Sequence, residues 1–216
     1  MRIGYDEQLK LLHAQIAAIG NNVIDAIKNV SVALKERDKK LAETIVQNDG
    51  TIDQLEKTIE SQCLKLLLME QPVARDLRNV SSALKMITDF ERIGDFASDI
   101  AEIVLEQEND EVNLDYGYIS EMTNDCVGMV SDCVRAFINQ DYSLAEKVCK
   151  WDDKVDRSFH AMKLALLSLI QHNPAAGDAA LDLMMVAKYL ERVGDHATNI
   201  AEWTMYAITG VHVKAN

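Results

Sequence analysis

Carboxylates recur at helical spacing in a segment that the chain contains twice. Residues 91–102 and 191–202 lie 100 residues apart and share eight of their twelve residues. At about 100° per residue, the four positions of each copy that carry acidic side chains, or asparagine in one case, fall on one side of a helix. They are Glu91, Asp95, Asp99 and Glu102 in one copy and Glu191, Asp195, Asn199 and Glu202 in the other. Like charges one helical turn apart repel each other, so two such acidic stripes predict a compensating cation.

Further carboxylates precede each copy. Asp49, Asp53, Glu56 and Glu60 share one helix face, whereas Asp152 and Asp156 begin an equivalent stripe that continues with Phe159 and Lys163. Facing carboxylates in a helical bundle supply the oxygen ligands that hard cations or iron take. A solvated polar face is the alternative explanation of these stripes.

Metal binding is the interpretation we favour, because the same helix faces are apolar one or two turns upstream. The apolar positions are Val80, Leu84 and Ile87 in one copy and Ala180, Met184 and Ala187 in the other. A face that begins apolar packs against a neighbouring element, so the carboxylates are expected to point toward another helix or a groove.

Glycine and arginine accompany the acidic stripe in both copies. Gly94 and Gly194 stand where a glycine inside a helix costs about 1 kcal/mol relative to alanine, which predicts a close approach by a neighbouring backbone or a ligand. Arg92 and Arg192 border the stripe and are expected to form ion pairs with it. Binding of a partner is the alternative role for these two arginines.

Histidine and cysteine give little support to other metal chemistry. His196 belongs to one copy, but Phe96 takes its place in the other, and no helix carries the Glu-x-x-His motif of ferritin-like di-iron bundles. The four cysteines include no Cys-x-x-Cys pair. Cys126 and Cys133 are two helical turns apart, and we expect all four to be small core side chains in a reducing cytoplasm.

Helical periodicity extends over nearly the whole chain. Apolar residues recur every three or four positions from Leu9 to Leu34, and sustained alternation typical of strands is absent. We predict helices over residues 5–36, 38–68 and 72–107, and again over 113–139, 141–171 and 175–209. Pro72 and Pro174 each precede a long helical pattern, where proline suits the first turn. The fold class is therefore all-α, with two tandem pseudo-symmetric three-helix bundles, 1–108 and 109–216, joined at the polar residues 106–111.

Charge and hydropathy exclude several classes of function. The 216 residues carry a formal net charge of −13, which argues against direct nucleic-acid binding because phosphate contacts need a basic surface. No apolar run is long enough to span a membrane, and the N-terminus lacks the apolar stretch of a signal peptide. We expect a cytoplasmic protein whose partners are cations or basic protein surfaces.

Taken together, these features resemble the PhoU family of phosphate-transport accessory regulators over nearly the whole chain. The resemblance rests on the two Glu-Arg-x-Gly-Asp segments at 91–95 and 191–195 and on the Asp-x-x-x-Asp pairs at 49–53 and 152–156. The segment Gln-Pro-Val-Ala-Arg-Asp-Leu-Arg at 71–78, which enters the third helix, contributes as well.

The resemblance implies a non-enzymatic regulator, often a homodimer, that reaches the membrane only through its partners. Such a protein couples a phosphate ABC transporter, with its ATPase, to a sensor histidine kinase and represses phosphate uptake and the phosphate-starvation response. The family also implies iron or zinc, in multinuclear clusters, on carboxylate-rich helix faces. Matched by motif, the metal ligands are Asp49, Asp53, Glu91, Asp95 and Asp99, and Asp152, Asp156, Glu191, Asp195 and Asn199. Asn199, Phe159 and Lys163 make the second set less anionic, which predicts a smaller cluster or weaker binding.

Two alternative functions use the same chemistry. A carboxylate-bridged metalloenzyme, such as an oxidase or a phosphatase, or a metal-storage bundle could use these residues. The absent Glu-x-x-His motif counts against both, and the chain has no recognisable nucleophile with its base and no phosphate-binding glycine loop. An accessory protein of another phosphate permease would differ from the leading hypothesis only in its partner.

Overall fold

The computed structural model describes residues 2–68, 73–107 and 115–212, and these residues are almost entirely helical. The α-helices are α1 (Arg2–Glu36), α2 (Lys39–Leu68), α3 (Ala74–Glu106), α4 (Gly117–Asn139), α5 (Tyr142–His172) and α6 (Gly177–Thr209). The short 3₁₀ helix η1 (Pro174–Ala176) precedes α6. The predicted all-α class is confirmed, and each described helix boundary lies within four residues of the predicted one. The predicted joint between the halves, at 108/109, and the predicted helix starts at 72 and 113 lie outside the described residues.

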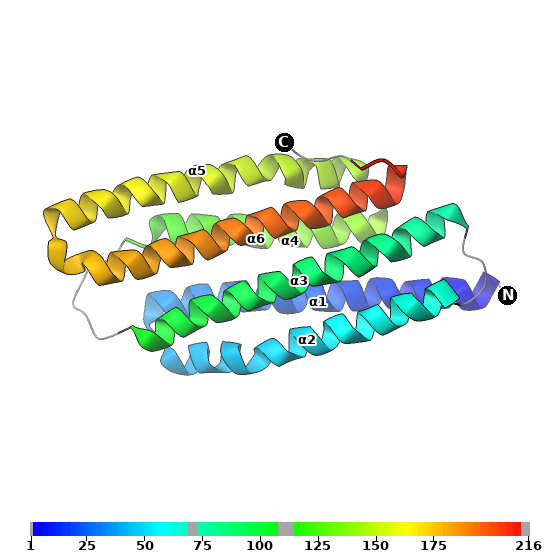
Figure 1. The fold of residues 1–216 in the computed structure, drawn as a ribbon, viewed down its shortest axis with the longest axis horizontal. Helices are drawn as coiled ribbons and strands as arrows, with labels where there is room; N and C mark the ends of the chain where they lie inside the picture. The colour runs from blue at the N-terminus through cyan, green and yellow to red at the C-terminus, as the bar shows by residue number, and fades with distance from the viewer. Residues whose placement is uncertain (1, 69–72, 108–114, 213–216) are drawn as a thin grey trace.

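The helices form two antiparallel bundles that lie side by side along their long axes (Figure 1). Helices α1, α2 and α3 form one bundle and α4, α5 and α6 the other, as the duplicated sequence predicts. Helix α3 packs along α6, and α1 packs along α4, so the repeated Glu-Arg-x-Gly-Asp helices form the centre of the contact between the bundles.

The turn that leads from the first to the second helix of each bundle is built in the same way. Arg37 and Gln140 both adopt left-handed backbone conformations with φ of 53°, which end α1 and α4. The next residue in each case is an aspartate that caps the following helix: Leu41 N donates to Asp38 Oδ1 at 3.0 Å, and Leu144 N donates to Asp141 Oδ1 at 3.0 Å. Such caps stabilise a helix by about 1 kcal/mol, and the equivalent turns set α2 and α5 at equivalent positions.

One continuous core joins the two bundles. The periodic apolar residues of α1, including Leu12, Ile16 and Ile19, are fully buried, as are Phe90 on α3 and Phe137 on α4. Burying side chains of this size stabilises the fold by about 1.5–3 kcal/mol each. Because the core crosses the contact between the bundles, the helices that carry the acidic stripes are held from behind by well-packed apolar side chains.

Three of the four cysteines, Cys63, Cys126 and Cys133, are buried as expected, whereas Cys149 is only partly buried against the core. Cys126 and Cys133 share the face of α4 that contacts α6, and their thiols donate to the carbonyl oxygens of Leu190 and Ala197 at 3.2 and 3.1 Å. Burial raises the pKa of the Cys63 thiol to about 12. Pro174 is the first residue of η1, one short turn before α6, whereas Pro72 lies outside the described residues.

Candidate metal centre

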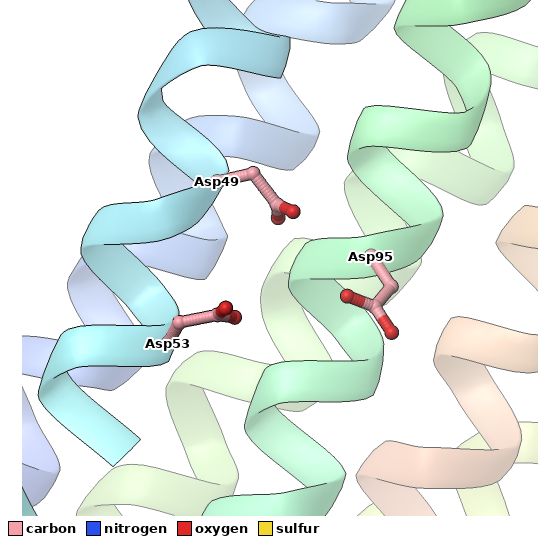
Figure 2. A group of neighbouring side chains, drawn as sticks. All are labelled: Asp49, Asp53 and Asp95. Atoms are coloured by element: carbon pink, nitrogen blue, oxygen red, sulfur yellow. The ribbon is translucent and has the colours of Figure 1, made fainter. Parts of the chain in front are cut away.

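Three aspartates from two helices converge in the first bundle. Asp49 and Asp53, about one turn apart on α2, project toward α3, from which Asp95 projects into the same space (Figure 2). Each of the three offers a carboxylate oxygen, and these oxygens all lie within 4.8 Å of one another. One metal ion can contact all three at ligand distances of about 2.0–2.6 Å. We call Asp49, Asp53, Glu91, Asp95 and Asp99 the first site.

Close packing of α2 against α3 brings these carboxylates together. Gly94 precedes Asp95 and faces Ile52, which precedes Asp53, and a Cβ atom on Gly94 would lie 2.8 Å from Ile52 Cδ1. The glycine thus lets the two backbones approach each other, as the sequence predicts. Ile52 and Gly94 each come one residue before an aspartate of the triad, so the apolar contact between α2 and α3 lies immediately beside the acidic one.

The negative charge of the carboxylates in the first site is not fully compensated by nearby positive side chains. Burial, followed by the charges of Asp95, Asp53 and Asp99, raises the pKa of Asp49 above its ordinary value. The pKa of Glu91 is also raised, by burial first and then by the charge of Asp95. A cation at the site would remove this mutual repulsion.

Arg92 compensates part of the charge of the first site. Its Nη1 donates to Asp95 Oδ2 at 3.0 Å, and its Nε lies 3.6 Å from Glu91 Oε2. The pKa of Asp95 is nevertheless raised, because burial outweighs the lowering effect of this arginine. The predicted ion pairs are therefore present for Arg92. Arg192 differs, since its guanidinium lies over the ring of Phe96, 4.8 Å from the centroid.

The equivalent carboxylates of the second bundle form the second site, which comprises Asp152, Asp156, Glu191, Asp195 and Asn199. Asp152 and Asp156 lie on α5 and the other three on α6. Burial, followed by the charges of Asp156 and Asp195, raises the pKa of Asp152 to about 7. A Cβ atom on Gly194 would lie 2.8 Å from Asp152 Oδ1, so the second glycine makes room for a carboxylate. Among the described residues, the triad of the first site is the only group of three metal-ligating side chains whose ligand atoms all lie within 4.8 Å of one another.

Unsatisfied oxygen atoms occur in both sites. Glu91 Oε2 and Asp152 Oδ1 are buried, and neither accepts a hydrogen bond. A buried acceptor without a partner costs about 1–3 kcal/mol, and more when it is charged. Carboxylate oxygens without donors are suitable ligands for a metal ion. The residues of the first site, where three carboxylates also converge, fit the cation that the sequence predicts, whereas the second site offers such an oxygen without a converging triad among the described residues.

Two of the predicted ligands, one from each site, make contacts across the bundles. Asn199 Nδ2 donates to Asp89 Oδ1 at 3.2 Å, and His196 Nδ1 lies 2.8 Å from the same oxygen. Asp99 faces Tyr189, whose pKa is raised by burial and then by the charge of Asp99 and a hydrogen bond to it. A role of Asn199 and Asp99 in metal binding stays a prediction.

Sequence reasoning missed Asp89, Tyr189 and Lys188. Asp89 and Tyr189 occupy equivalent positions 100 residues apart, just before the repeated segments, and each contacts the other copy of the segment. Lys188 forms an ion pair with Glu191 inside the second site. A comparison of the two copies could have revealed these residues, because Thr88 corresponds to Lys188 and Asp89 corresponds to Tyr189.

A groove with a volume of about 240 Å³ opens beside Asp49 in the first bundle, lined also by Asn22, Asp25, Asn29 and Asn48. In the second bundle, Trp151 stands at the position equivalent to Asn48. Its indole nitrogen donates to Asp125 Oδ1 at 3.1 Å, so a side chain of the protein itself occupies this region.

Comparison with known proteins identifies the family. A family model described as the PhoU domain matches the chain twice, over residues 16–104 and 119–204. The chain belongs to the PhoU family. The two PhoU domain matches fall on either side of the predicted joint, and each contains one copy of the repeated segment.

The PhoU relatives are similar over nearly their full length. A protein of Clostridium acetobutylicum named phosphate-specific transport system accessory protein PhoU homolog is 34% identical over 98% of this chain and 97% of its own. The homologue of that name from Aquifex aeolicus is 35% identical over 96% of this chain and 94% of its own. The crystal structure of PhoU from Pseudomonas aeruginosa superposes with a TM-score of 0.90 at 31% identity and covers 96% of this chain and 100% of that one. A phosphate transport system regulatory protein PhoU from Streptococcus pneumoniae gives a TM-score of 0.89 at 27% identity, covering 97% and 99%.

These likenesses confirm the predicted family and the fold of two PhoU-like bundles. No helix among the described residues is long and apolar enough to cross a membrane. Neither result tests the metal ligands, which rest on the geometry and electrostatics of the two sites.

Proposed function

We propose that this protein is a non-enzymatic accessory protein of a phosphate-specific transport system that relays transporter status to a sensor kinase. The observation that carries the proposal is the similarity, over at least 94% of both chains, to relatives named as accessory proteins of that system. In this proposal the protein works in the cytoplasm as a homodimer. It contacts the transporter ATPase and the sensor histidine kinase, and it represses phosphate uptake and the phosphate-starvation response when phosphate is plentiful.

Contact with partners is supported by the shape and charge of the chain. The long helices of the described residues share one continuous core, and the net charge of −13 favours basic partner surfaces. Binding between surfaces of opposite charge weakens as salt screens the charges.

A deletion strain tests the regulatory role. Without this protein, a phosphate-starvation reporter should stay switched on in phosphate-rich medium, and the wild-type gene should restore repression. Normal repression in the deletion strain, with no paralogue present, would show that the protein does not relay transporter status. The accessory role at another phosphate permease would then be the better explanation.

The second part of the proposal is that the first site binds iron or zinc through Asp49, Asp53 and Asp95, with Glu91 beside them. The convergence of three carboxylates within 4.8 Å supports it, as does Oε2 of Glu91, which is buried and accepts no hydrogen bond. An all-oxygen ligand set suits a hard ion such as ferric iron better than zinc, which more often takes nitrogen and sulfur ligands. The bound cation would supply the positive charge that holds α2 and α3 together.

Elemental analysis tests metal binding. After purification with Fe²⁺ or Zn²⁺ present, the wild-type protein should retain metal, and the D49N/D53N variant should lose most of the metal of the first site. The matched control is E7Q/E43Q, which also removes two carboxylates but at exposed positions outside both sites. Equal metal content in D49N/D53N, E7Q/E43Q and the wild type would contradict this role of the triad.

A further inference from the structure

The two sites differ most at the end nearest the apolar part of the stripe. In the first bundle this end carries Glu56 and Thr88, and Thr88 Oγ1 donates to Glu56 Oε1 at 3.3 Å. The charge of Glu56 also contributes to the raised pKa of Glu91. In the second bundle the equivalent positions, 103 and 100 residues later, are Phe159 and Lys188. The second site therefore lacks one negative side chain and carries one additional positive side chain, a difference of two unit charges.

Lys188 is held in the second site by two contacts. Its ammonium group donates to Glu191 Oε2, and it lies over the ring of Phe159, 5.4 Å from the centroid. The Glu191 side chain is only 15% exposed, so the pair is shielded from water on one side. A cation is attracted to the negative face of an aromatic ring, and this attraction keeps the ammonium close to the carboxylate.

The charge of Lys188 reaches beyond Glu191. It opposes the rise in the pKa of Asp156 and of Asp195, although burial remains the larger effect on both carboxylates. One ammonium group thus acts on three of the five residues of the second site, Glu191, Asp156 and Asp195. Any metal ion that enters this site must compete with it.

Arg92 is the internal cation of the first site, but it is placed differently. It pairs with Asp95 and Glu91 from a side chain that is 54% exposed, against 44% for Lys188. The clearer difference is that Arg92 lies over no aromatic ring of the described residues. Arg92 can turn into solvent at little cost, whereas Lys188 would leave both its carboxylate and its ring.

We infer that Lys188, seated on Phe159, is the residue that makes the second site a weaker metal site than the first. The inference rests on the proposed metal binding. Lys188 does not bind metal itself; it occupies the position from which a metal ion would neutralise Glu191.

Titration of the second site in isolation tests this inference. The D49N/D53N background silences the triad of the first site, and Mn²⁺ serves as a redox-stable probe that carboxylates bind well. Replacing Lys188 by threonine, its counterpart in the first bundle, should raise the Mn²⁺ affinity about tenfold or more in electron paramagnetic resonance titrations. The double change K188T/F159E, which also restores the glutamate, should raise it further.

Matched variants separate a charge effect from a packing effect. K188R keeps the positive charge and should leave the Mn²⁺ affinity low, whereas K188M removes the charge but keeps the bulk and should behave like K188T. The reciprocal change T88K/E56F, made in an otherwise wild-type chain, should lower the affinity of the first site. Circular dichroism melts verify that each variant is folded.

Three results would overturn the inference. The first is unchanged second-site affinity in both K188T and K188M. The second is a rise in K188R as large as in K188T, which would indicate altered packing. Both leave the proposed function standing, provided that the wild type binds Mn²⁺ and D49N/D53N loses the part of that binding that belongs to the first site. The third is a complete lack of binding in the wild type and in K188T/F159E, which would contradict the metal proposal and this inference together.

Discussion

Asp152 is the carboxyl group whose ionisation is opposed most strongly by burial and by neighbouring negative charge. Its side chain is half-buried, its Oδ1 accepts no hydrogen bond, and three other carboxylates of the second site act on it. Burial and these charges together favour the neutral form, which is why its pKa rises to about 7. The pKa values of Asp49 and Glu91 are raised less, but for the same two reasons. The effect occurs in both bundles because both carry the same acidic stripe.

The stability of the metal-free protein should therefore depend on Asp152 and on pH. The folded state binds more protons than the unfolded chain between the ordinary value of 3.8 and about 7, so this group lowers stability progressively as the pH rises through that window. The D152N variant should raise the free energy of unfolding at pH 8 by about 1–2 kcal/mol, after a discount for partial exposure, and change it little at pH 4.

Urea denaturation at both pH values measures this effect. The control is D153N, which removes the exposed neighbouring carboxylate and should change stability little at either pH. An equal effect of D152N at pH 4 and pH 8 would show that the carboxyl group does not titrate across this window.

At the scale of the helices, the two bundles solve the same packing problem differently. Helices α4 and α5 pack closely at Gly128, where a Cβ atom would lie 2.6 Å from Trp151 Cη2. Trp151 is fixed further by Asp125 and by Lys147, whose ammonium lies 4.9 Å from the ring centroid. Lys147 also pairs with the buried Asp132 at 3.0 Å. In the first bundle, polar residues and a groove take the place of this indole and its partners.

Alanine substitutions at two glycines should consequently have opposite effects. Gly128→Ala should lower the free energy of unfolding by about 1–3 kcal/mol, because the rigid indole cannot move aside without losing its contacts. Gly50→Ala is the matched control: Gly50 also lies inside a helix, but nothing stands within 4 Å of its added Cβ, and the change should raise stability by up to about 1 kcal/mol. Thermal melts measure both, and a Gly128→Ala variant as stable as the parent would contradict the close-packing argument.

At the scale of the whole molecule, α3 and α6 make two equivalent but chemically different contacts. Asp89 on α3 meets His196 and Asn199 on α6, whereas Tyr189 on α6 stacks on Phe96 with ring centroids 5.8 Å apart and faces Asp99. Each difference between the copies is thus matched by a difference on the facing helix. The carboxylate of Asp89 faces polar donors, whereas the phenol of Tyr189 faces an aromatic ring and a carboxylate.

A double-mutant cycle on Asp89 and His196 should reveal coupling between the bundles. Asp89→Ala leaves His196 and Asn199 without their shared acceptor and should cost about 1–3 kcal/mol. His196→Phe introduces the residue of the other copy, and the coupling energy between the two changes should be about 0.5–3 kcal/mol. The control cycle combines Asp89→Ala with His172→Phe, an exposed histidine at the end of α5, and should be additive. Additivity in the Asp89–His196 cycle would show that this contact does not join the bundles.

The sequence by itself determined the elements, the duplication and the composition of both sites. Helical periodicity is a local property, so the predicted helices agree with the observed ones within a few residues, and the acidic stripe falls on one face of its helix in each copy. Gly94 and Gly194 could be predicted as points of close approach, because a glycine inside a helix needs a reason that packing supplies.

Only the tertiary structure decided which carboxylates meet. Periodicity fixes the direction of a side chain around its own helix, but the distance to another helix depends on the axial shift and rotation between the two, which distant core contacts set. This is why Asp49, Asp53 and Asp95 converge, while Asn199 turns to Asp89 and Arg192 turns to Phe96. Lys188 comes only three residues before Glu191, but their pairing also depends on the tertiary structure, because Phe159 on α5 holds the ammonium in place.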